Sequence, residues 1–146
     1  PMTNELFTIR DARPDDKAVL DGYANLEGMD AIPSIEGVRV AVNEDDEVVG
    51  FLRIALAEDG TAFVNPVITH ETWRGFGVGR ALMEEALARH GELRLVSRGG
   101  SLPFYEALGY ERIGWDLIEM SLVDDCDHCE MRDECGPVPV RKVREG

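Results

Sequence analysis

The distribution of hydrophobic and polar residues along the chain predicts alternating strands and helices. Strands are expected where apolar and polar positions alternate or where apolar residues run together, at residues 7–10, 38–42, 48–56, 61–68, 93–97, 110–113 and 115–122. Helices are expected where apolar residues recur at helical spacing, at residues 13–25, 78–90 and 101–108. Proline and acidic residues favour the start of the first helix, and Gly91 is placed to end the second.

The order of these elements predicts the fold class. Polar turns at 43–46 and 58–60 join three consecutive strands into an antiparallel meander, and the helix after them makes a crossover to a parallel fifth strand. We therefore expect an α/β fold with a mixed, mostly antiparallel sheet of six to seven strands and helices on both faces. Pro66 interrupts the fourth strand and removes a ladder donor, so an edge or a bulge is expected at Asn65–Pro66.

Composition and charge indicate which kinds of binding partner are improbable for this chain. The 146 residues are 44% hydrophobic and 30% charged, as in one globular domain. With 15 basic and 29 acidic residues the formal net charge is −14, which argues against binding nucleic acid or an anionic membrane. No apolar run approaches the roughly 18 residues of a membrane span. The first residues have neither a basic region nor an apolar core, so we expect no secretory leader.

A glycine cluster lies between the fourth strand and the second predicted helix. Glycine allows positive φ and close approach to a ligand, and the first turn of a helix presents unpaired N–H groups. Together with Arg74 and Arg80, this arrangement is suited to a phosphate or pyrophosphate, although a tight turn without a ligand is the simpler alternative. The cluster lacks the Gly-Lys-Ser/Thr of a nucleoside-triphosphate loop, and it does not follow a first strand as a dinucleotide fingerprint does.

Two motifs resemble those of the GNAT superfamily of N-acetyltransferases. Arg74-x-x-Gly77-x-Gly79 is similar to the family's pyrophosphate loop, Gln/Arg-x-x-Gly-x-Gly/Ala. The segment Ser101-Leu102-Pro103-Phe104-Tyr105-Glu106-Ala107-Leu108-Gly109-Tyr110 resembles a second motif that comes late in that family. The resemblance covers about residues 6–122. It implies the acyl-CoA N-acyltransferase fold, in which the fourth and fifth strands splay apart, and it implies acetyl-CoA as cosubstrate.

The resemblance assigns cosubstrate-binding roles to three segments of the chain. The residues implied are Val67, Ile68 and Thr69 beside the pantetheine arm, Arg74, Gly75, Phe76, Gly77, Val78, Gly79 and Arg80 around the pyrophosphate, and Ser101 and Phe104 on the distal side. Many members of the family have asparagine where this chain has Ser101, which weakens that one assignment. Tyr105 matches the position that often protonates the leaving thiolate, and a buried aromatic residue with a bonded hydroxyl is the alternative.

The acceptor and the general base are less defined by the sequence. The resemblance implies direct acetyl transfer to a primary amine of a small molecule or a peptide. Candidate bases are His70, Glu71, Glu27 and Asp30, and a water relay is equally consistent with the sequence. Trp73 is interpreted as a packing residue rather than a substrate contact. A non-catalytic module that senses acyl-CoA, metal or redox state is the alternative function.

A cysteine-rich tail, 123–146, follows the predicted acetyltransferase domain, 1–122. An odd number of cysteines is not a disulfide framework and favours the reducing cytoplasm. The spacing of Cys126, Cys129 and Cys135 is suited to zinc or an iron–sulfur cluster, without an evident fourth ligand. Metal-free thiols and an intersubunit contact in a homodimer are the alternatives, and the family resemblance does not explain this tail.

Overall fold

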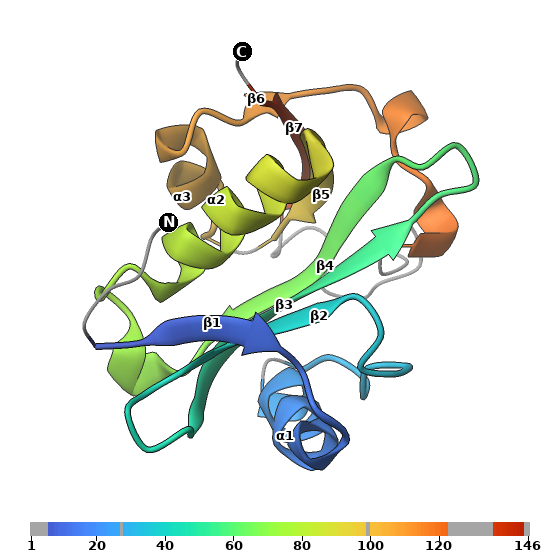
Figure 1. Cartoon of the computed structure of the whole chain (residues 1–146). Coiled ribbons are helices and arrows are strands. Elements are labelled where there is room, and N and C mark those ends of the chain that lie inside the picture. The colour runs from blue at the N-terminus through green and yellow to red at the C-terminus, as the bar shows by residue number, and fades with distance from the viewer. Residues whose placement is uncertain (1–5, 27, 99, 123–135, 145–146) are drawn as a thin grey trace. The chain divides into compact units, whose positions relative to one another are not determined.

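The computed structural model describes residues 6–26, 28–98, 100–122 and 136–144, and the chain divides into two compact units (Figure 1). The first unit consists of Pro1–Ile54 and Pro66–Ala86, and the second of Ala55–Asn65 and Leu87–Gly146. Seven strands are hydrogen-bonded in the order β1-β2-β3-β4-β5-β7-β6. The mixed α/β fold predicted from the sequence is therefore confirmed.

The boundaries of the elements follow the hydrophobic pattern closely up to residue 110. The strands are β1 Thr8–Asp11, β2 Val38–Val42, β3 Val48–Leu56, β4 Ala62–Thr69, β5 Glu92–Ser97, β6 Glu111–Arg112 and β7 Val138–Val143. The α-helices are α1 Lys17–Leu26, α2 Val78–His90 and α3 Leu102–Ala107. Short 3-10 turns occur at η1 Pro14–Asp16, η2 Glu71–Trp73, η3 Trp115–Leu117 and η4 Met120–Leu122.

In the first unit, helices lie on both faces of an antiparallel sheet. Leu20 and Ala24 of α1 pack in one core cluster with Val40 and Phe51, whose side chains leave β2 and β3 on the same face. The neighbouring residues of these strands point to the opposite face, because successive side chains of a strand alternate. On that face Arg39 of β2 makes a bidentate ion pair with Glu85 of α2 at 2.8 and 2.9 Å.

A close approach between β3 and the start of α2 depends on Gly50. A Cβ atom at Gly50 would lie 2.8 Å from the Cγ1 of Val78 and 3.0 Å from the carbonyl oxygen of Ile68. Val78 is the first residue of α2 and is 1% exposed. The absence of a side chain at Gly50 therefore allows the first turn of α2 to lie directly against β3, beside the end of β4.

The second unit is built around β5 and β7. These strands pair antiparallel over six residue pairs, from Glu92↔Val143 to Ser97↔Val138, and β6 pairs with the outer side of β7. Phe63, Val96 and Ile118 form a core cluster of this unit. Lys142 of β7 donates a hydrogen bond of 2.6 Å to the carbonyl oxygen of Leu108 and so holds the end of α3 against the strand.

The prediction of a strand at residues 115–122 is wrong. That segment forms the two turns η3 and η4, and the last strand is β7, inside the segment assigned to the cysteine-rich tail. The place beside β5 is taken by β7, so residues 115–122 have no free strand edge there. Side chains bind the segment instead: Arg94 donates to the carbonyl oxygen of Leu117 at 2.8 Å, and Asn65 donates to that of Leu122 at 3.2 Å.

The parallel ladder between β4 and β5 is short. It consists of the pairs Ala62↔Leu93 and Phe63↔Arg94 among the described residues. Strand β4 continues through Pro66 to Thr69 without the interruption expected at the proline. Because Pro66 comes after the last of these pairs, its missing N–H group costs the ladder no hydrogen bond.

None of the helices in the described part of the chain is both long enough and apolar enough to span a membrane.

We predict that the same glycine-to-alanine change has opposite effects at Gly50 and Gly22. Gly50→Ala should lower the free energy of unfolding by about 1–3 kcal/mol, because the new methyl group overlaps Val78 and the Ile68 carbonyl. Gly22→Ala should raise it by about 0.5–1 kcal/mol, because Gly22 lies within α1 with nothing within 4 Å of the added atom. Urea denaturation measures both. Equal changes at the two positions would contradict the proposed close approach.

Candidate active site

The loop between β4 and α2 has the backbone conformation that its glycines predict. Gly75 and Gly77 have φ angles of +88° and +83°, which side chains other than glycine rarely adopt. A Cβ atom at either position would have no protein atom within 4 Å. The glycines are therefore needed for the turn itself, and the space in front of them is open.

The start of α2 presents backbone N–H groups to this open space. The first hydrogen bond at the end of the helix runs from the N–H of Ala81 to the carbonyl oxygen of Gly77, at 2.9 Å. Within the part of the chain that the structure describes, no hydrogen bond takes up the N–H groups of Gly77, Val78, Gly79 or Arg80. These groups, with the positive end of the helix dipole, form a cup of the kind that suits an anion.

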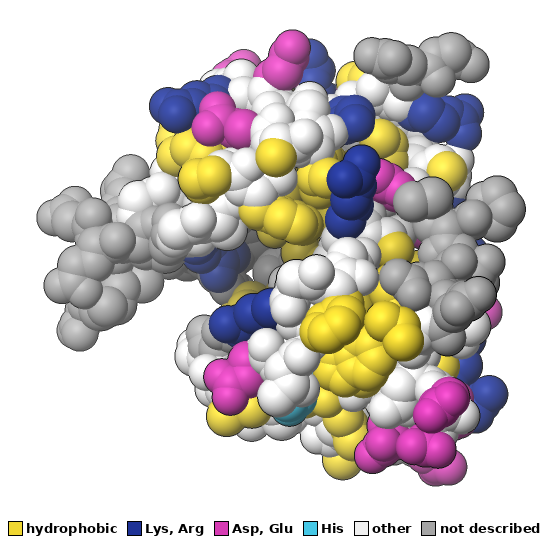
Figure 2. All heavy atoms as spheres, turned by 90° about the vertical axis from the view of Figure 1, so that its left-hand side faces the viewer, with side chains coloured by type: hydrophobic (Ala, Val, Ile, Leu, Met, Phe, Trp, Pro, Cys, Tyr) yellow, Lys and Arg dark blue, Asp and Glu magenta, His cyan; other side chains and the backbone are white. Residues whose placement is uncertain are grey.

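The two arginines beside the cup differ in their surroundings. Arg80 is exposed and pairs with Glu84 one turn along α2, at 2.9 Å. Arg74 follows η2 and lines a pocket beside the loop. The loop between β4 and α2 is the green segment on the left of Figure 1, and Figure 2 turns that side of the molecule toward the viewer. Hydrophobic and basic side chains are exposed on this side (Figure 2).

Two aromatic residues of the loop pack on each other. The rings of Trp73 and Phe76 are 5.4 Å apart and tilted by 54°. Phe76 is 48% exposed, so this pair forms an apolar surface next to the cup rather than part of the core.

Val67, Ile68 and Thr69 lie on β4 between Pro66 and the loop. Ile68 is buried against the α1 face, whereas Val67 and Thr69 are half-buried. All three come after the Phe63↔Arg94 pair, the last pair of the described β4–β5 ladder. Their backbone groups on that edge are therefore not used by the ladder with β5.

A pocket of about 320 Å³ in the first unit brings together residues from α1, the end of β4 and η2. Its lining consists of Tyr23, Leu26, Ile68, Thr69, His70, Glu71 and Arg74. Three of these were predicted to bind the cosubstrate, and two were candidate bases. Tyr23 was missed, because its position in an apolar helical stripe indicated only core packing. Its hydroxyl donates to the carbonyl oxygen of Val48 at 2.6 Å, which directs the ring edge toward His70.

His70 is held in one orientation by its neighbours. Its Nδ1 accepts a hydrogen bond from the backbone N–H of Thr72 at 3.2 Å, and the Thr72 hydroxyl lies 2.8 Å from the same atom. An Nδ1 atom that accepts a hydrogen bond from an N–H group carries no proton itself. The neutral ring therefore carries its proton on Nε2. The Nε2 of neutral His70 is therefore a donor, which argues against its use as a base through that atom.

The other candidate bases are distributed differently. Glu71 is exposed and lines the pocket, and Asp30 is exposed but is not among the lining residues. Glu27 lies outside the described residues. Asp21, an acidic residue of α1, accepts hydrogen bonds from Lys17 at 2.6 Å and from the N–H of Ile32 at 3.1 Å.

In the second unit, Tyr105 is a buried tyrosine of α3 packed between two other rings. The ring of Phe104 lies 5.1 Å away and that of Tyr110 lies 5.9 Å away, both nearly perpendicular to it. No hydrogen bond from the Tyr105 hydroxyl to any described residue is recorded. Burial raises the pKa of Tyr105 to about 12, against a smaller opposite effect of Arg98. The hydroxyl is therefore protonated at neutral pH and has a proton to donate.

The hydroxyl groups of Tyr110 and Ser101 have surroundings that the sequence did not indicate. The Tyr110 hydroxyl is buried and has no hydrogen-bond partner among the described residues, and burial raises its pKa well above the usual range. Ser101 donates to the carbonyl oxygen of Arg98 at 2.7 Å and accepts from the Arg98 N–H at 3.1 Å. The hydroxyl hydrogen of Ser101 therefore closes the turn before α3. Phe104, the other residue predicted on this side, is 39% exposed.

The predicted metal ligands Cys126, Cys129 and Cys135 lie outside the described residues. Among the residues that are described, no group of three or more His, Cys, Asp or Glu side chains could hold a metal ion.

Comparison with known proteins gives one family match and several relatives. Residues 34–112 match the model of the acetyltransferase (GNAT) domain. The peptidyl-lysine N-acetyltransferase YjaB of Escherichia coli K12 is 36% identical over 88 residues, which cover 59% of this chain and 54% of that protein. The chain thus matches about half the length of this relative.

Two further comparisons extend over nearly the whole chain. An uncharacterized N-acetyltransferase of Chlorobaculum tepidum, CT2212, is 24% identical over 148 residues, covering 92% of this chain and 95% of that protein. The crystal structure of Rv2747 from Mycobacterium tuberculosis, a complex with CoA, matches with a TM-score of 0.75 at 14% identity, covering 94% and 99% of the two chains. At this identity the structural match is evidence for the fold alone.

We predict that all three tyrosines of the folded protein ionise above the usual pKa of 10. The chain has three tyrosines, and burial raises the pKa of Tyr23, Tyr105 and Tyr110 alike. An ultraviolet titration of tyrosinate should show Tyr105→Phe losing a transition near pH 12. Because the unfolded tyrosines ionise first, stability should be independent of these groups below pH 10 and should fall as the pH rises further. A transition at pH 10 lost in Tyr105→Phe would contradict the burial of its hydroxyl.

Proposed function

Since the chain belongs to the GNAT family of acetyltransferases, which its match over more than half of the sequence establishes, we propose that it transfers an acetyl group from acetyl-CoA to a primary amine. The observation that carries the proposal is the open cup of unused backbone N–H groups at the start of α2. We place the reaction in the cytoplasm, the compartment that an odd number of cysteines favours.

The cup fits a diphosphate better than any other group of acetyl-CoA. Backbone N–H groups of Gly77 to Arg80 would donate to phosphate oxygens, and the positive φ angles of Gly75 and Gly77 keep side chains out of their way. Arg74 and Arg80 would add positive charge at the rim. Arg80 would contribute the less of the two, because Glu84 already pairs with it.

Strand β4 would bind the pantetheine arm through its backbone. The edge groups of Val67, Ile68 and Thr69 lie beyond the β4–β5 ladder, and a pantetheine arm carries amide groups that match them. The backbone N–H of Val67 or Ile68 would also stabilise negative charge on the carbonyl oxygen during transfer. Among the natural amino acids only proline would remove this N–H group.

Acetyl-CoA, when bound, supplies an acetyl thioester whose carbonyl carbon is attacked by the nitrogen of the amine, with the C–S bond breaking. Tyr105 would donate its hydroxyl proton to the departing thiolate; the hydroxyl is protonated at neutral pH, and the raised pKa makes it a weaker acid than an ordinary tyrosine. Tyr105 would afterwards recover a proton from water. The protonated amine would lose one proton through water, past the carboxylate of Glu71, before its nitrogen attacks, and a second proton after the C–N bond has formed. One of these two protons balances the one that Tyr105 recovers, and the other passes to solvent.

The pocket beside the loop is the proposed acceptor site. Leu26 and Tyr23 provide an apolar wall, and Glu71 provides a carboxylate that attracts a protonated amine. The relative YjaB is named as a peptidyl-lysine N-acetyltransferase, and a lysine side chain has the alkyl stem and terminal amine that this lining would accommodate. A small-molecule amine with a similar alkyl chain would be bound by the same contacts.

We predict that acetyl-CoA raises the melting temperature and that Gly77→Glu abolishes this effect. At a hundredfold excess over the Kd, binding should add about 2.7 kcal/mol to the stability. A carboxylate at position 77 would occupy the phosphate cup. Thermal denaturation measures the shift, with inorganic phosphate at the same concentration expected to have little effect.

Gly60→Glu is the matched control for this experiment. Gly60 also has a positive φ, +88°, and open space around it, but it lies in the β3–β4 turn of the second unit. The Gly60→Glu variant should be less stable than the unsubstituted protein, as Gly77→Glu should be, but acetyl-CoA should still raise its melting temperature. Absence of any shift in the unsubstituted protein at millimolar acetyl-CoA would overturn the proposed function.

We predict that Tyr105→Phe lowers kcat about a hundredfold or more while leaving the acetyl-CoA-induced thermal shift unchanged, because only proton donation is lost. Tyr110→Phe is the matched control: it removes a buried hydroxyl without a described partner, so it should leave kcat unchanged and not lower the stability. A free-thiol release assay with a panel of amines measures kcat. Equal losses in both variants would mean that packing, not the Tyr105 hydroxyl, supports turnover.

A further inference from the structure

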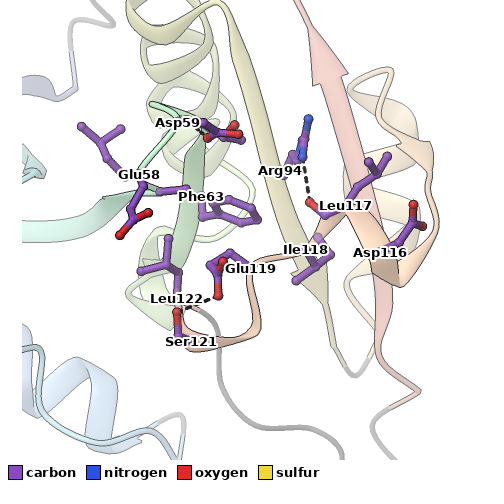
Figure 3. A pocket seen from close by; sticks show the side chains of 13 residues that line it. Glu58, Asp59, Phe63, Arg94, Asp116, Leu117, Ile118, Glu119, Ser121 and Leu122 are labelled. Atoms are coloured by element: carbon purple, nitrogen blue, oxygen red, sulfur yellow. Dashed lines mark hydrogen bonds between the residues drawn. The ribbon is translucent and has the colours of Figure 1, made fainter.

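A pocket in the second unit has no role in the proposed reaction. It has a volume of about 640 Å³. Its lining side chains come from the hairpin formed by the end of β3, the β3–β4 turn and the start of β4, from Arg94 of β5, and from the stretch that contains η3 and η4 (Figure 3).

The floor of this pocket is apolar. Phe63 and Ile118 belong to the core cluster of the second unit, and Ala57 and Leu122 pack against that cluster while remaining partly exposed. Leu56, at the edge, is 59% exposed. An apolar side chain seated here would cover surface that the described part of the chain leaves in contact with water.

The rim of the pocket is acidic. Glu58, Asp59, Asp116 and Glu119 are exposed carboxylates, and Arg94 is the one basic lining residue, which gives a formal charge of 1 − 4 = −3. Hydrogen bonds from Thr61 hold the pKa of Asp59 below its usual range, so this carboxylate remains charged at mildly acidic pH.

Arg94 offsets only part of the charge of this rim. Its charge favours the ionised form of Asp59, while its Nε donates to Glu92 at 2.8 Å and its Nη1 donates to the carbonyl oxygen of Leu117 at 2.8 Å. These hydrogen bonds connect β5 to η3. The lining therefore keeps a net negative charge above an apolar floor.

We propose that this pocket docks a basic peptide segment of a partner protein, with an apolar side chain on the floor and flanking lysine or arginine side chains on the rim carboxylates. The carboxylates lie in two pairs, one on the β3–β4 turn and one on the stretch that contains η3 and η4, and no group of three or more in the described chain could hold a metal ion. Glu119 accepts a hydrogen bond from Ser121 at 2.9 Å, and Asp59 accepts one from the N–H of Thr61 at 2.9 Å. Spaced charges around an apolar centre complement a peptide better than a compact cation.

The test measures binding of a fluorescein-labelled, N-acetylated peptide of alternating lysine and leucine by fluorescence anisotropy, without acetyl-CoA. The double variant Asp116→Asn/Glu119→Gln should weaken binding by about tenfold, since exposed ion pairs each contribute a few-fold. The matched control Glu44→Gln/Asp45→Asn removes the same charge from an exposed turn of the first unit that does not line the pocket. It should leave the affinity within about twofold, the size expected of a general charge effect.

A second peptide tests the apolar floor without altering the protein. Replacing leucine by serine while keeping the lysines should reduce binding to the level of the double variant. Several outcomes would overturn the proposal: equal affinity for both peptides, equal losses in the variant and its control, no measurable binding, or full competition by the polyamine spermine at the peptide's own concentration. Because acetyl-CoA is absent, none of these outcomes depends on whether the protein is an active transferase.

Discussion

The contact of Gly50 with Val78 and Ile68 is the constraint on which the rest of the first unit depends. Only a residue without a side chain allows β3 to lie within van der Waals distance of both the first residue of α2 and the end of β4. This contact fixes where α2 begins, and with it the direction in which the amides of Gly77 to Arg80 point. The bidentate Arg39–Glu85 pair holds the same helix further along. The position of the cup and the direction of its N–H groups therefore follow from the packing of α2 against β2 and β3.

Backbone groups explain how so acidic a chain could bind a diphosphate. The net charge of −14 opposes an anion at long range, and the charge of Arg80 is shared with Glu84. Amide N–H groups and a helix terminus act at contact distance and are unaffected by the net charge of the protein, which solvent ions screen within about 10 Å. An acidic surface and an anion-binding loop are therefore compatible, and the surface remains free to attract a cationic acceptor.

The sequence correctly predicted the features that depend on residues close together in the chain. The family, the fold class and the positive φ angles of Gly75 and Gly77 are confirmed, because glycine spacing and apolar periodicity are direct consequences of backbone geometry. The strand at 115–122 was wrong, because alternation alone does not reveal that β7, far along the chain, takes the place beside β5. The tautomer of His70 and the use of the Ser101 hydroxyl depend on contacts that no spacing encodes.

Charge also connects binding of the acceptor with release of the product. A protonated amine would be drawn by Glu71. Acetylation converts that amine to a neutral amide, so the attraction by Glu71 is lost once the acetyl group has been transferred. The neutral product would then be held only by the apolar contacts of Tyr23 and Leu26, and its release would follow from the chemical step itself.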